Sequence, residues 1–301
     1  MVTPPYLVEG DKVGIVCTAR KVNRADLDDG IAFLKSCGLV PVLGKTIGAA
    51  DNQYGGTDKL RAADLQELLD DEEIKAVWCA KGGYGTVRII DEINFYKFVK
   101  YPKWIVGYSD VTVLHSQIHK LGFETIHAIM PVGISRNTAV AKQTLENAWS
   151  GKPLHYHIDS HPLNRQGTGK GELVGGNISI LYSLCGSHSA INTDNTILFI
   201  EDLDEYLYHV DRMMVNLKRN GILRNLRGLV VGGLTSMHDN SVPFGKTAHE
   251  IVLDAVSEYD YPVCFDFPAG HLKDNRALIL GRSTSLEVNE RGAKLYFDQI
   301  E

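Results

Sequence analysis

The sequence lacks the features that would place it in a membrane or on nucleic acid. No run of about 18 uncharged apolar residues occurs in the 301 residues, and the first ten have no basic start followed by an apolar stretch. Lysine and arginine are scattered, and the formal net charge is only -6, so no basic stripe favours nucleic acid or a lipid surface. We therefore expect a cytoplasmic protein whose partners are small molecules.

Cysteine is scarce, which excludes a disulfide framework. The five cysteines are an odd number, are widely spaced and mostly lie inside apolar runs. Such a pattern is typical of reduced thiols in a protein core, and it does not have the spacing of a metal-binding knuckle. We expect no chemistry from any of them.

Two motif classes are present only in incomplete form. Gly82-Gly83-Tyr84-Gly85 follows an apolar run, but it has neither the G-x-G-x-x-G spacing nor the Gly-Lys-Ser/Thr ending of phosphate-binding loops. His115 and His119 lie four apart on a predicted helix, a spacing that can bind one metal ion, yet the glutamate of the zincin pattern is missing. A nucleotide enzyme and a metal site remain the weaker alternatives, and we expect no metal and no cofactor.

The first half of the chain alternates between short apolar runs and helix-period stretches. With 44% hydrophobic residues, the chain is long enough for two domains with cores of their own. The alternation predicts an α/β fold with a Rossmann-like, mostly parallel sheet and helices on both faces, whose site lies at the carboxyl ends of the strands. The expected strands are 12–17, 40–43, 74–80 and 104–108, and the expected helices are 25–37, 61–69, 86–93 and 111–121.

A shift to proline, glycine and histidine at 151–170 predicts a linker between domains 1–150 and 171–301. The second domain is expected to be a smaller α/β unit that ends in short antiparallel strands. Its expected strands are 197–200, 228–231 and 262–265, its helices are 208–220 and 247–259, and its antiparallel tail strands are 277–280, 285–288 and 293–297.

One serine stands on a predicted turn between a strand and a helix. The apolar run from Trp104 ends on Gly107-Tyr108-Ser109-Asp110 and continues into helical sequence. A serine at such a turn stands next to the free N–H groups that open the helix, and these donors can stabilise an oxyanion. The arrangement suits a nucleophile, although a serine before aspartate at a helix start is also an ordinary N-cap.

Two further residues share this placement at strand ends. The apolar run Ile197-Leu198-Phe199-Ile200 stops at Glu201, and His271 lies in the loop Phe267-Pro268-Ala269-Gly270-His271 just after another strand. A hydrolytic serine needs a base and an acceptor that orients the base, and His271 and Glu201 could fill those roles. The alternatives are a first solvated glutamate after a strand and a surface or packed histidine.

The motifs taken together are more specific than any one of them. They are Tyr54 with Arg61 and Asp64-Leu65, Lys81-Gly82-Gly83-Tyr84-Gly85, Gly107-Tyr108-Ser109-Asp110, Gly175-Gly176-Asn177, Glu201-Asp202 with Asp211-Arg212, and Phe267-Pro268-Ala269-Gly270-His271 with Asn275. In their order and spacing, over nearly its whole length, the chain resembles the LD-carboxypeptidase family of serine peptidases. That family includes the murein tetrapeptide carboxypeptidases and the microcin C immunity peptidases.

The resemblance implies a role for each motif. Ser109 would be the nucleophile, His271 the base and Glu201 the residue that orients the base. The backbone N–H groups of Asp110 and Gly83 would form the oxyanion hole. From the same motifs, Lys81, Tyr84 and Asn177 are candidate substrate-binding residues. No metal or organic cofactor is implied, and we expect a homodimer.

Three stretches depart from the family pattern. Lys81 replaces the usual arginine before Gly-Gly-Tyr-Gly, so the planar group that grips a carboxylate with two hydrogen bonds is lost while the charge is kept. Cys17-Thr18-Ala19-Arg20 and His127-Ala128-Ile129-Met130 also differ from the usual Pro-Ser-Ser-like and His-Gly-Pro-Met stretches.

The resemblance implies a serine carboxypeptidase that cleaves between an L-residue and a terminal D-residue. Its expected substrate is murein tetrapeptide in cell-wall recycling, cut between L-lysine or meso-diaminopimelate and D-alanine. Two alternatives remain open: a microcin C immunity-type peptidase that cleaves a peptidyl or aminoacyl nucleotide conjugate, and a non-enzymatic two-domain protein that binds a small molecule in its crevice.

Overall fold

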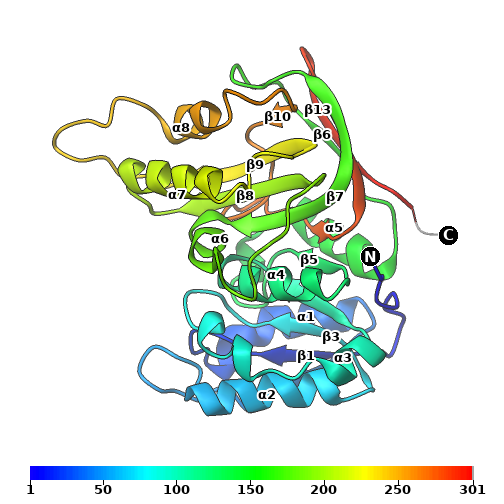
Figure 1. Ribbon diagram of the computed structural model, residues 1–301. Helices are drawn as coiled ribbons and strands as arrows, with labels where there is room; N and C mark the ends of the chain where they lie inside the picture. Colours follow the sequence, from blue (N-terminus) through cyan, green and yellow to red (C-terminus); the bar gives the residue numbers. More distant parts are fainter. Residues whose placement is uncertain (300–301) are drawn as a thin grey trace.

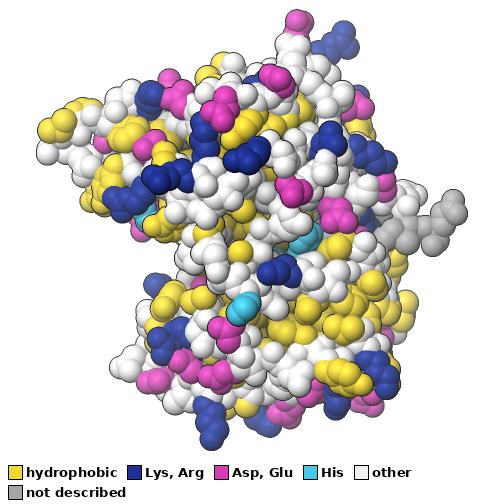
Figure 2. All heavy atoms as spheres, in the orientation of Figure 1, with side chains coloured by type: hydrophobic (Ala, Val, Ile, Leu, Met, Phe, Trp, Pro, Cys, Tyr) yellow, Lys and Arg dark blue, Asp and Glu magenta, His cyan; other side chains and the backbone are white. Residues whose placement is uncertain are grey.

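The computed structural model describes residues 1–299 as two halves, each built around one sheet (Figure 1). The six-stranded sheet of the first half and the seven-stranded sheet of the second half stand one above the other in this view. On the face that Figure 2 shows, acidic and basic side chains are interspersed, and a recess separates the two halves at one side. Within residues 1–299, no helix is both long and apolar enough to cross a membrane.

The first half alternates strands and helices, as the sequence predicts. Its strands are β1 (Lys12–Val16), β2 (Val40–Leu43), β3 (Ile74–Cys79), β4 (Trp104–Gly107) and β5 (Thr125–His127). Its helices are α1 (Asp28–Ser36), α2 (Asp58–Asp70), α3 (Tyr96–Lys100), α4 (Thr112–Lys120) and α5 (Ala139–Ser150). Short 3-10 turns are η1 (Arg24–Leu27), η2 (Thr86–Arg88), η3 (Ile90–Glu92), η4 (Ser109–Val111) and η5 (Ile134–Arg136).

The first sheet has the strand order β11-β5-β4-β3-β1-β2, and β1 to β5 run parallel. This is the 2-1-3-4-5 order of a doubly wound sheet, in which the order reverses between β1 and β3. Crevices in such sheets open at the carboxyl ends of the strands, next to that reversal. The fold therefore puts the residues that follow β1, β3 and β4 at the edge where such a crevice opens.

Strand β3 shows why helices cover both faces of this sheet. Ala76 and Trp78 belong to a core cluster with residues of α1 and α5, whereas Val77 and Cys79 belong to a cluster with residues of α2 and α4. Successive side chains of a strand point to opposite faces, so a continuous apolar run buries both.

The second half begins inside the stretch that we expected to be an irregular linker. Its strands are β6 (His155–Ile158), β7 (Gly167–Asn177), β8 (Ile197–Leu203), β9 (Gly228–Thr235), β10 (Val263–Cys264), β11 (Leu278–Leu280), β12 (Ser283–Asn289) and β13 (Gly292–Phe297). Its helices are α6 (Ile178–Leu184), α7 (Leu207–Arg219) and α8 (Ala248–Ala255). Residues 151–170 thus hold β6 and the start of β7.

The second sheet is mixed, with the order β10-β9-β8-β7-β12-β13-β6. Strands β7 to β10 are parallel, and β12, β13 and β6 continue the sheet in antiparallel fashion. One face packs against α6, α7 and α8. Residues of the other face, such as Phe199 and Val230, share a core cluster with Trp78 and Ile126 of the first half, so one apolar core joins the two halves.

One predicted helix is wrong, and one predicted antiparallel strand forms but joins the other sheet. The expected helix at 86–93 is a pair of 3-10 turns, η2 and η3, because the Thr86 N–H donates to the Asp110 carboxylate (2.8 Å) and the segment is too short for a full helix. The expected tail strand at 277–280 is β11, which pairs antiparallel with β5 of the first sheet instead of joining the antiparallel strands of the second. Period-two patterns indicate a strand but not its partner.

Candidate active site

A cleft of about 580 Å³ lies where strands of both sheets end. Its walls are formed by residues that come after β1, β3 and β4 of the first sheet and after β8 and β10 of the second. The residues that line it are Arg20, Lys81, Gly82, Gly83, Tyr108, Ser109, Met130, Leu203, Asp204, Glu205 and His271. The structure therefore brings Ser109, His271, Lys81 and Gly83 together from distant parts of the chain.

Ser109 occupies a sharp turn directly after β4. Its φ angle is +64°, in the left-handed region that non-glycine residues rarely adopt, and the 3-10 turn η4 begins at this residue. The backbone of Gly82 packs closely against it: a Cβ on Gly82 would lie 2.9 Å from Ser109 Cβ and 3.1 Å from Ser109 Oγ. A larger residue at position 82 would collide with the serine side chain.

Asp110 connects the serine turn to the glycine loop that follows β3. Its side chain is 1% exposed, and Oδ2 accepts a hydrogen bond from the Thr86 N–H (2.8 Å). Burial raises the pKa of Asp110, although hydrogen bonds from Thr86 and Gly85 oppose the shift. The contact fixes the Asp110 backbone, whose N–H lies at the start of η4.

Glu201 lies behind His271 and accepts hydrogen bonds from it. Glu201 is fully buried at the end of the apolar part of β8, and its Oε2 lies 2.7 Å from His271 Nδ1 and 3.1 Å from the His271 backbone N–H. A Cβ on Gly270 would come within 2.6 Å of the same oxygen, so a glycine here allows the loop to approach the carboxylate. Nε2 is the ring nitrogen that remains to accept a proton.

The environment of His271 favours its charged form. Burial lowers the pKa of His271, but the hydrogen bond to Glu201 and the charges of Glu201 and Asp202 together raise it above that of an ordinary histidine. The Tyr108 ring packs edge-on against the imidazole, with the ring centres 4.9 Å apart. Burial raises the pKa of Tyr108 to about 12, so this ring stays neutral.

The cleft walls differ in charge. Arg20 and Lys81 follow β1 and β3 on the first sheet, and a Cβ on Gly83 would lie 2.6 Å from the Arg20 side chain, which therefore packs over the glycine loop. Asp204 and Glu205 follow β8 on the second sheet, and each is paired with a histidine outside the cleft lining (both contacts 2.6 Å). A ligand in this cleft meets cations on one wall and carboxylates on the other.

Two residues that the motifs single out lie elsewhere. Asn177 is 3% exposed, caps α6, and donates its side-chain amide to Asp202 (2.9 Å). Tyr84 is exposed, and its ring packs against Tyr54. Neither is among the lining residues of the cleft within the described chain.

Sequence reasoning assigned no site role to five cleft residues: Tyr108, Met130, Leu203, Asp204 and Glu205. The position of Asp204-Glu205 just after β8 was the available signal, because polar residues at the carboxyl end of a parallel strand face the crevice.

The histidines with metal-ligand spacing do not share a site. Both ring nitrogens of His115 are hydrogen-bonded, to Thr125 Oγ1 (2.8 Å) and to the Gly107 carbonyl (2.9 Å), and burial lowers the pKa of this residue to about 4. His119 instead approaches Glu172 (3.3 Å). His115 thus supports the strand that leads to Ser109.

The cysteines do not offer a competing nucleophile. All five are free thiols. Burial raises the pKa of Cys17, Cys79 and Cys264 to about 12, so these three remain protonated and unreactive at neutral pH.

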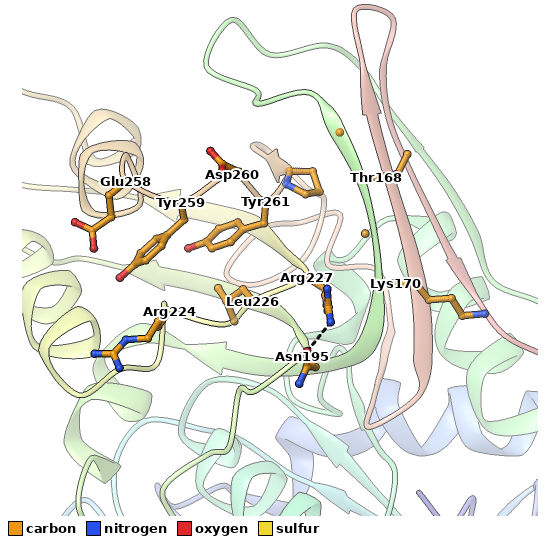
Figure 3. Close-up of a pocket in the computed structure, with 13 residues that line it drawn as sticks. Thr168, Lys170, Asn195, Arg224, Leu226, Arg227, Glu258, Tyr259, Asp260 and Tyr261 are labelled. Carbon is orange, nitrogen blue, oxygen red and sulfur yellow. Dashed lines mark hydrogen bonds between the residues drawn. The ribbon is translucent and has the colours of Figure 1, made fainter.

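A larger cavity of about 840 Å³ lies at the opposite end of the second sheet, where β7 and β9 begin (Figure 3). Tyr259 and Tyr261 lie stacked beside it, and Arg227 donates to Asn195 (2.7 Å) across its rim. None of its lining residues within the described chain is a serine, cysteine or histidine. The cavity is larger than the cleft, but it holds none of the three candidate residues Ser109, Glu201 and His271.

Two domain models of one peptidase family match this chain. A model of the LD-carboxypeptidase N-terminal domain matches residues 13–128, and a model of the LD-carboxypeptidase C-terminal domain matches residues 170–286. The protein is therefore a serine-type carboxypeptidase. The chain belongs to the LD-carboxypeptidase family, which confirms the resemblance that its motifs indicate.

Individual relatives are similar over almost the whole chain. A probable murein peptide carboxypeptidase of Bacillus subtilis is 35% identical over 300 residues, which cover 96% of this chain and 93% of that protein. The microcin C7 self-immunity protein MccF of Escherichia coli is 24% identical and covers 96% of this chain and 94% of its own. The crystal structure of muramoyltetrapeptide carboxypeptidase from Oxalobacter formigenes superposes with a TM-score of 0.87 at 25% identity, covering 95% of this chain and 98% of that one.

Proposed function

We propose that Ser109, His271 and Glu201 form a catalytic triad that hydrolyses the bond between an L-residue and a terminal D-alanine. The observation that supports it most is the buried Glu201 carboxylate on His271 Nδ1 (2.7 Å), in a cleft that Ser109 also lines. A carboxylate at Nδ1 fixes the tautomer in which Nε2 can accept the serine proton. The contact with His271 also gives the fully buried Glu201 carboxylate a partner, without which its burial would be costly.

The proposed reaction uses Ser109, His271 and Glu201 in two stages, acylation and hydrolysis of the acyl-enzyme. Ser109 Oγ attacks the scissile carbonyl carbon while His271 Nε2 takes the hydroxyl proton, and the resulting imidazolium is stabilised by Glu201. The same proton passes to the nitrogen of the departing D-alanine when the peptide bond breaks. Water then attacks the acyl carbon and gives a proton to His271 Nε2. The bond from the acyl carbon to Ser109 Oγ breaks, His271 passes that proton to Ser109 Oγ, and the shortened peptide leaves.

The proposed oxyanion hole consists of two backbone N–H groups, those of Asp110 and Gly83. The Asp110 N–H opens η4 beside the serine, and its position is fixed by the contact from the Asp110 side chain to Thr86. The glycine loop with Gly83 lines the cleft next to Ser109 and supplies the second donor. Both proposed donors are main-chain groups, which do not depend on a side-chain rotamer.

The charged walls suit a peptide with a free carboxylate and an ammonium group. Lys81 and Arg20 provide positive charge for the terminal carboxylate of D-alanine, and Asp204 and Glu205 provide negative charge for the amino group of a lysine or diaminopimelate side chain. The proposed substrate is therefore murein tetrapeptide, a choice that the names of the carboxypeptidase relatives also support.

A second candidate substrate is an aminoacyl or peptidyl nucleotide conjugate. Similarity to the microcin C7 self-immunity protein over 96% of this chain favours it. Purified protein should be incubated with a murein tetrapeptide and, separately, with an aminoacyl sulfamoyl nucleotide. Release of D-alanine at a kcat/KM at least about tenfold higher than cleavage of the conjugate supports the first function; the reverse ratio favours the second.

A further inference from the structure

Three metal-binding side chains meet on the second half of the molecule, outside the cleft. They are His161 in the loop between β6 and β7, His249 in α8, and Asp266 just after β10. His249 Nε2 lies 3.0 Å from Asp266 Oδ1, and His161 Nε2 lies 3.7 Å from Asp266 Oδ2. One ligand atom from each residue falls within 4.8 Å of the other two. No residue of this set lines the catalytic cleft within the described chain.

The spacing of these groups matches that of a shared metal ion. Zinc takes nitrogen and oxygen ligands at about 2.0–2.2 Å, so two ligands on a tetrahedral ion lie roughly 3.3–3.5 Å apart. The two histidine contacts to Asp266 lie near this distance, at 3.0 Å to Oδ1 and 3.7 Å to Oδ2, so a small movement would bring both imidazoles to one ion beside the carboxylate. The imidazole centres of His161 and His249 are 5.3 Å apart. Two imidazoles on one tetrahedral ion would lie at about the same separation.

We propose that His161, His249 and Asp266 bind one zinc ion. Two neutral imidazoles and one carboxylate form a donor set that zinc prefers, and three protein ligands leave the fourth position for water. A cavity of about 280 Å³, lined in part by His161 and Asp266, gives that water room. The side chains of both histidines are partly exposed (22% and 24%), so the ion can enter from solution.

Binding requires one local rearrangement at His161. Its Nδ1 accepts a hydrogen bond from the Leu163 N–H (3.1 Å), whereas a histidine that ligates through Nε2 carries its proton on Nδ1. The Leu163 contact must therefore open when zinc binds. A single hydrogen bond between neutral groups contributes little net free energy, so this costs no more than about a tenfold loss in affinity.

The zinc ion would join three segments behind the loop that holds the catalytic base. Asp266 precedes Phe267, a fully buried residue whose N–H donates to the Val231 carbonyl (3.0 Å), and it lies five positions before His271. The ion would tie this loop to α8 and to the connection between β6 and β7. Its effect is on the stability of the fold, because it adds no group to the cleft.

Zinc titration of the full chain tests this site. After treatment with a chelator and its removal, calorimetry should show one zinc ion bound per chain, and the thermal midpoint should rise when zinc is added. Cobalt in place of zinc should give the intense visible absorption of a tetrahedral site. Asp266→Asn and His249→Ala should each weaken zinc binding at least about tenfold and abolish the thermal shift.

The variants are chosen so that a folding defect is not mistaken for loss of a ligand. Asp266 has φ = +56°, a conformation that asparagine tolerates, so Asp266→Asn should keep the zinc-free thermal midpoint. The matched control is His155→Ala, an exposed histidine on β6 whose ring faces Tyr296. It should bind zinc as the wild type does. No zinc bound by the wild type, or equal affinity in wild type and Asp266→Asn, would overturn the proposal.

Discussion

At the scale of single residues, Glu201 sets the chemistry of His271. The carboxylate is fully buried, whereas the imidazole borders the cleft, so the hydrogen bond between them runs from the protein interior to the cleft wall. A neutral His271 is needed to accept the serine proton. Activity should therefore fall as the pH decreases through the raised pKa of His271.

Replacing Glu201 tests this dependence. Glu201→Gln removes the charge that raises the pKa of His271 and leaves burial, which lowers it. The acidic limb of the kcat/KM profile should then move to lower pH, and kcat should drop by about 10³- to 10⁴-fold because the tautomer and the imidazolium lose their support. The profile should be measured with circular dichroism as a check on folding. An acidic limb at the same pH in both proteins would show that Glu201 does not act on His271.

Lys81 tests how the free carboxylate is recognised. A buried carboxylate without a positive partner would cost several kcal/mol, so an exopeptidase needs a cation at this position. Lys81→Arg should retain the preference for a tetrapeptide over its C-terminal amide, and Lys81→Ala should erase it mainly through KM. Full preference in the alanine variant would contradict the role and make Arg20, on the same wall, the next candidate.

The sequence predicts some cleft residues better than others. Ser109 and His271 each follow a strand in a recognisable motif, and the structure places both on one cleft. Asp204 and Glu205 could not be told from solvated residues after a strand, because their position depends on how the second sheet faces the first. The contacts of Asn177 could not be predicted from the sequence either: its side-chain amide donates to Asp202 and accepts from the Ile180 N–H at the start of α6.

At the scale of elements, substitutions at two glycines should have different effects, one on catalysis and one on stability. Gly82→Ala would place a Cβ 2.9 Å from Ser109 Cβ, whereas Gly14→Ala would place one 2.9 Å from the Leu68 methyl groups in the core of the first half. We expect Gly82→Ala to lower kcat about 100-fold with little change in the thermal midpoint, because the serine and its donors are displaced.

Gly14→Ala provides the matched comparison. It should lower the free energy of unfolding by about 1–3 kcal/mol through overpacking while kcat stays close to that of the wild type. Urea denaturation and steady-state kinetics of both variants decide the matter. If Gly82→Ala lost stability and kept its turnover, the glycine loop would not be packed against Ser109 in the way that the structure shows.

Element prediction succeeded where apolar runs are long and failed where they are short or rich in glycine. The apolar cores of β1, β3, β4 and β8 are unbroken and were predicted close to their observed bounds. In contrast, β5 has only three residues, and the 11-residue β7 has a glycine-rich sequence that reads as a loop. Pattern alone also could not show that β11 returns to the first sheet, since its partner β5 lies about 150 residues away.

At the scale of the whole molecule, the proposed machinery is divided between the two sheets. The first sheet holds Ser109 and the glycine loop, and the second holds Glu201 and His271. A continuous apolar core joins the two halves, so packing fixes the position of Ser109 and the glycine loop relative to Glu201 and His271. The homodimer, the cytoplasmic location and the domain bounds at 150 and 171 stay predictions.

The proposed mechanism predicts that removal of metal ions leaves the catalytic activity unchanged. The proposed steps use side chains and backbone of the cleft, and both nitrogens of His115 are occupied by Thr125 and Gly107. Prolonged treatment with a chelator should leave kcat/KM within about twofold, even if the thermal midpoint falls through loss of zinc at Asp266. Activity that a chelator abolishes and zinc restores would contradict the metal-free mechanism.

The most direct test of the account is the turnover of Ser109→Ala on murein tetrapeptide. Because Ser109 is the proposed source of the attacking oxygen, we expect kcat for D-alanine release to fall by roughly 10⁴-fold or more, with a thermal midpoint close to that of the wild type. A variant that kept more than about a tenth of wild-type turnover, a loss of less than ~1.4 kcal/mol in transition-state stabilisation, would show that Ser109 is not the nucleophile.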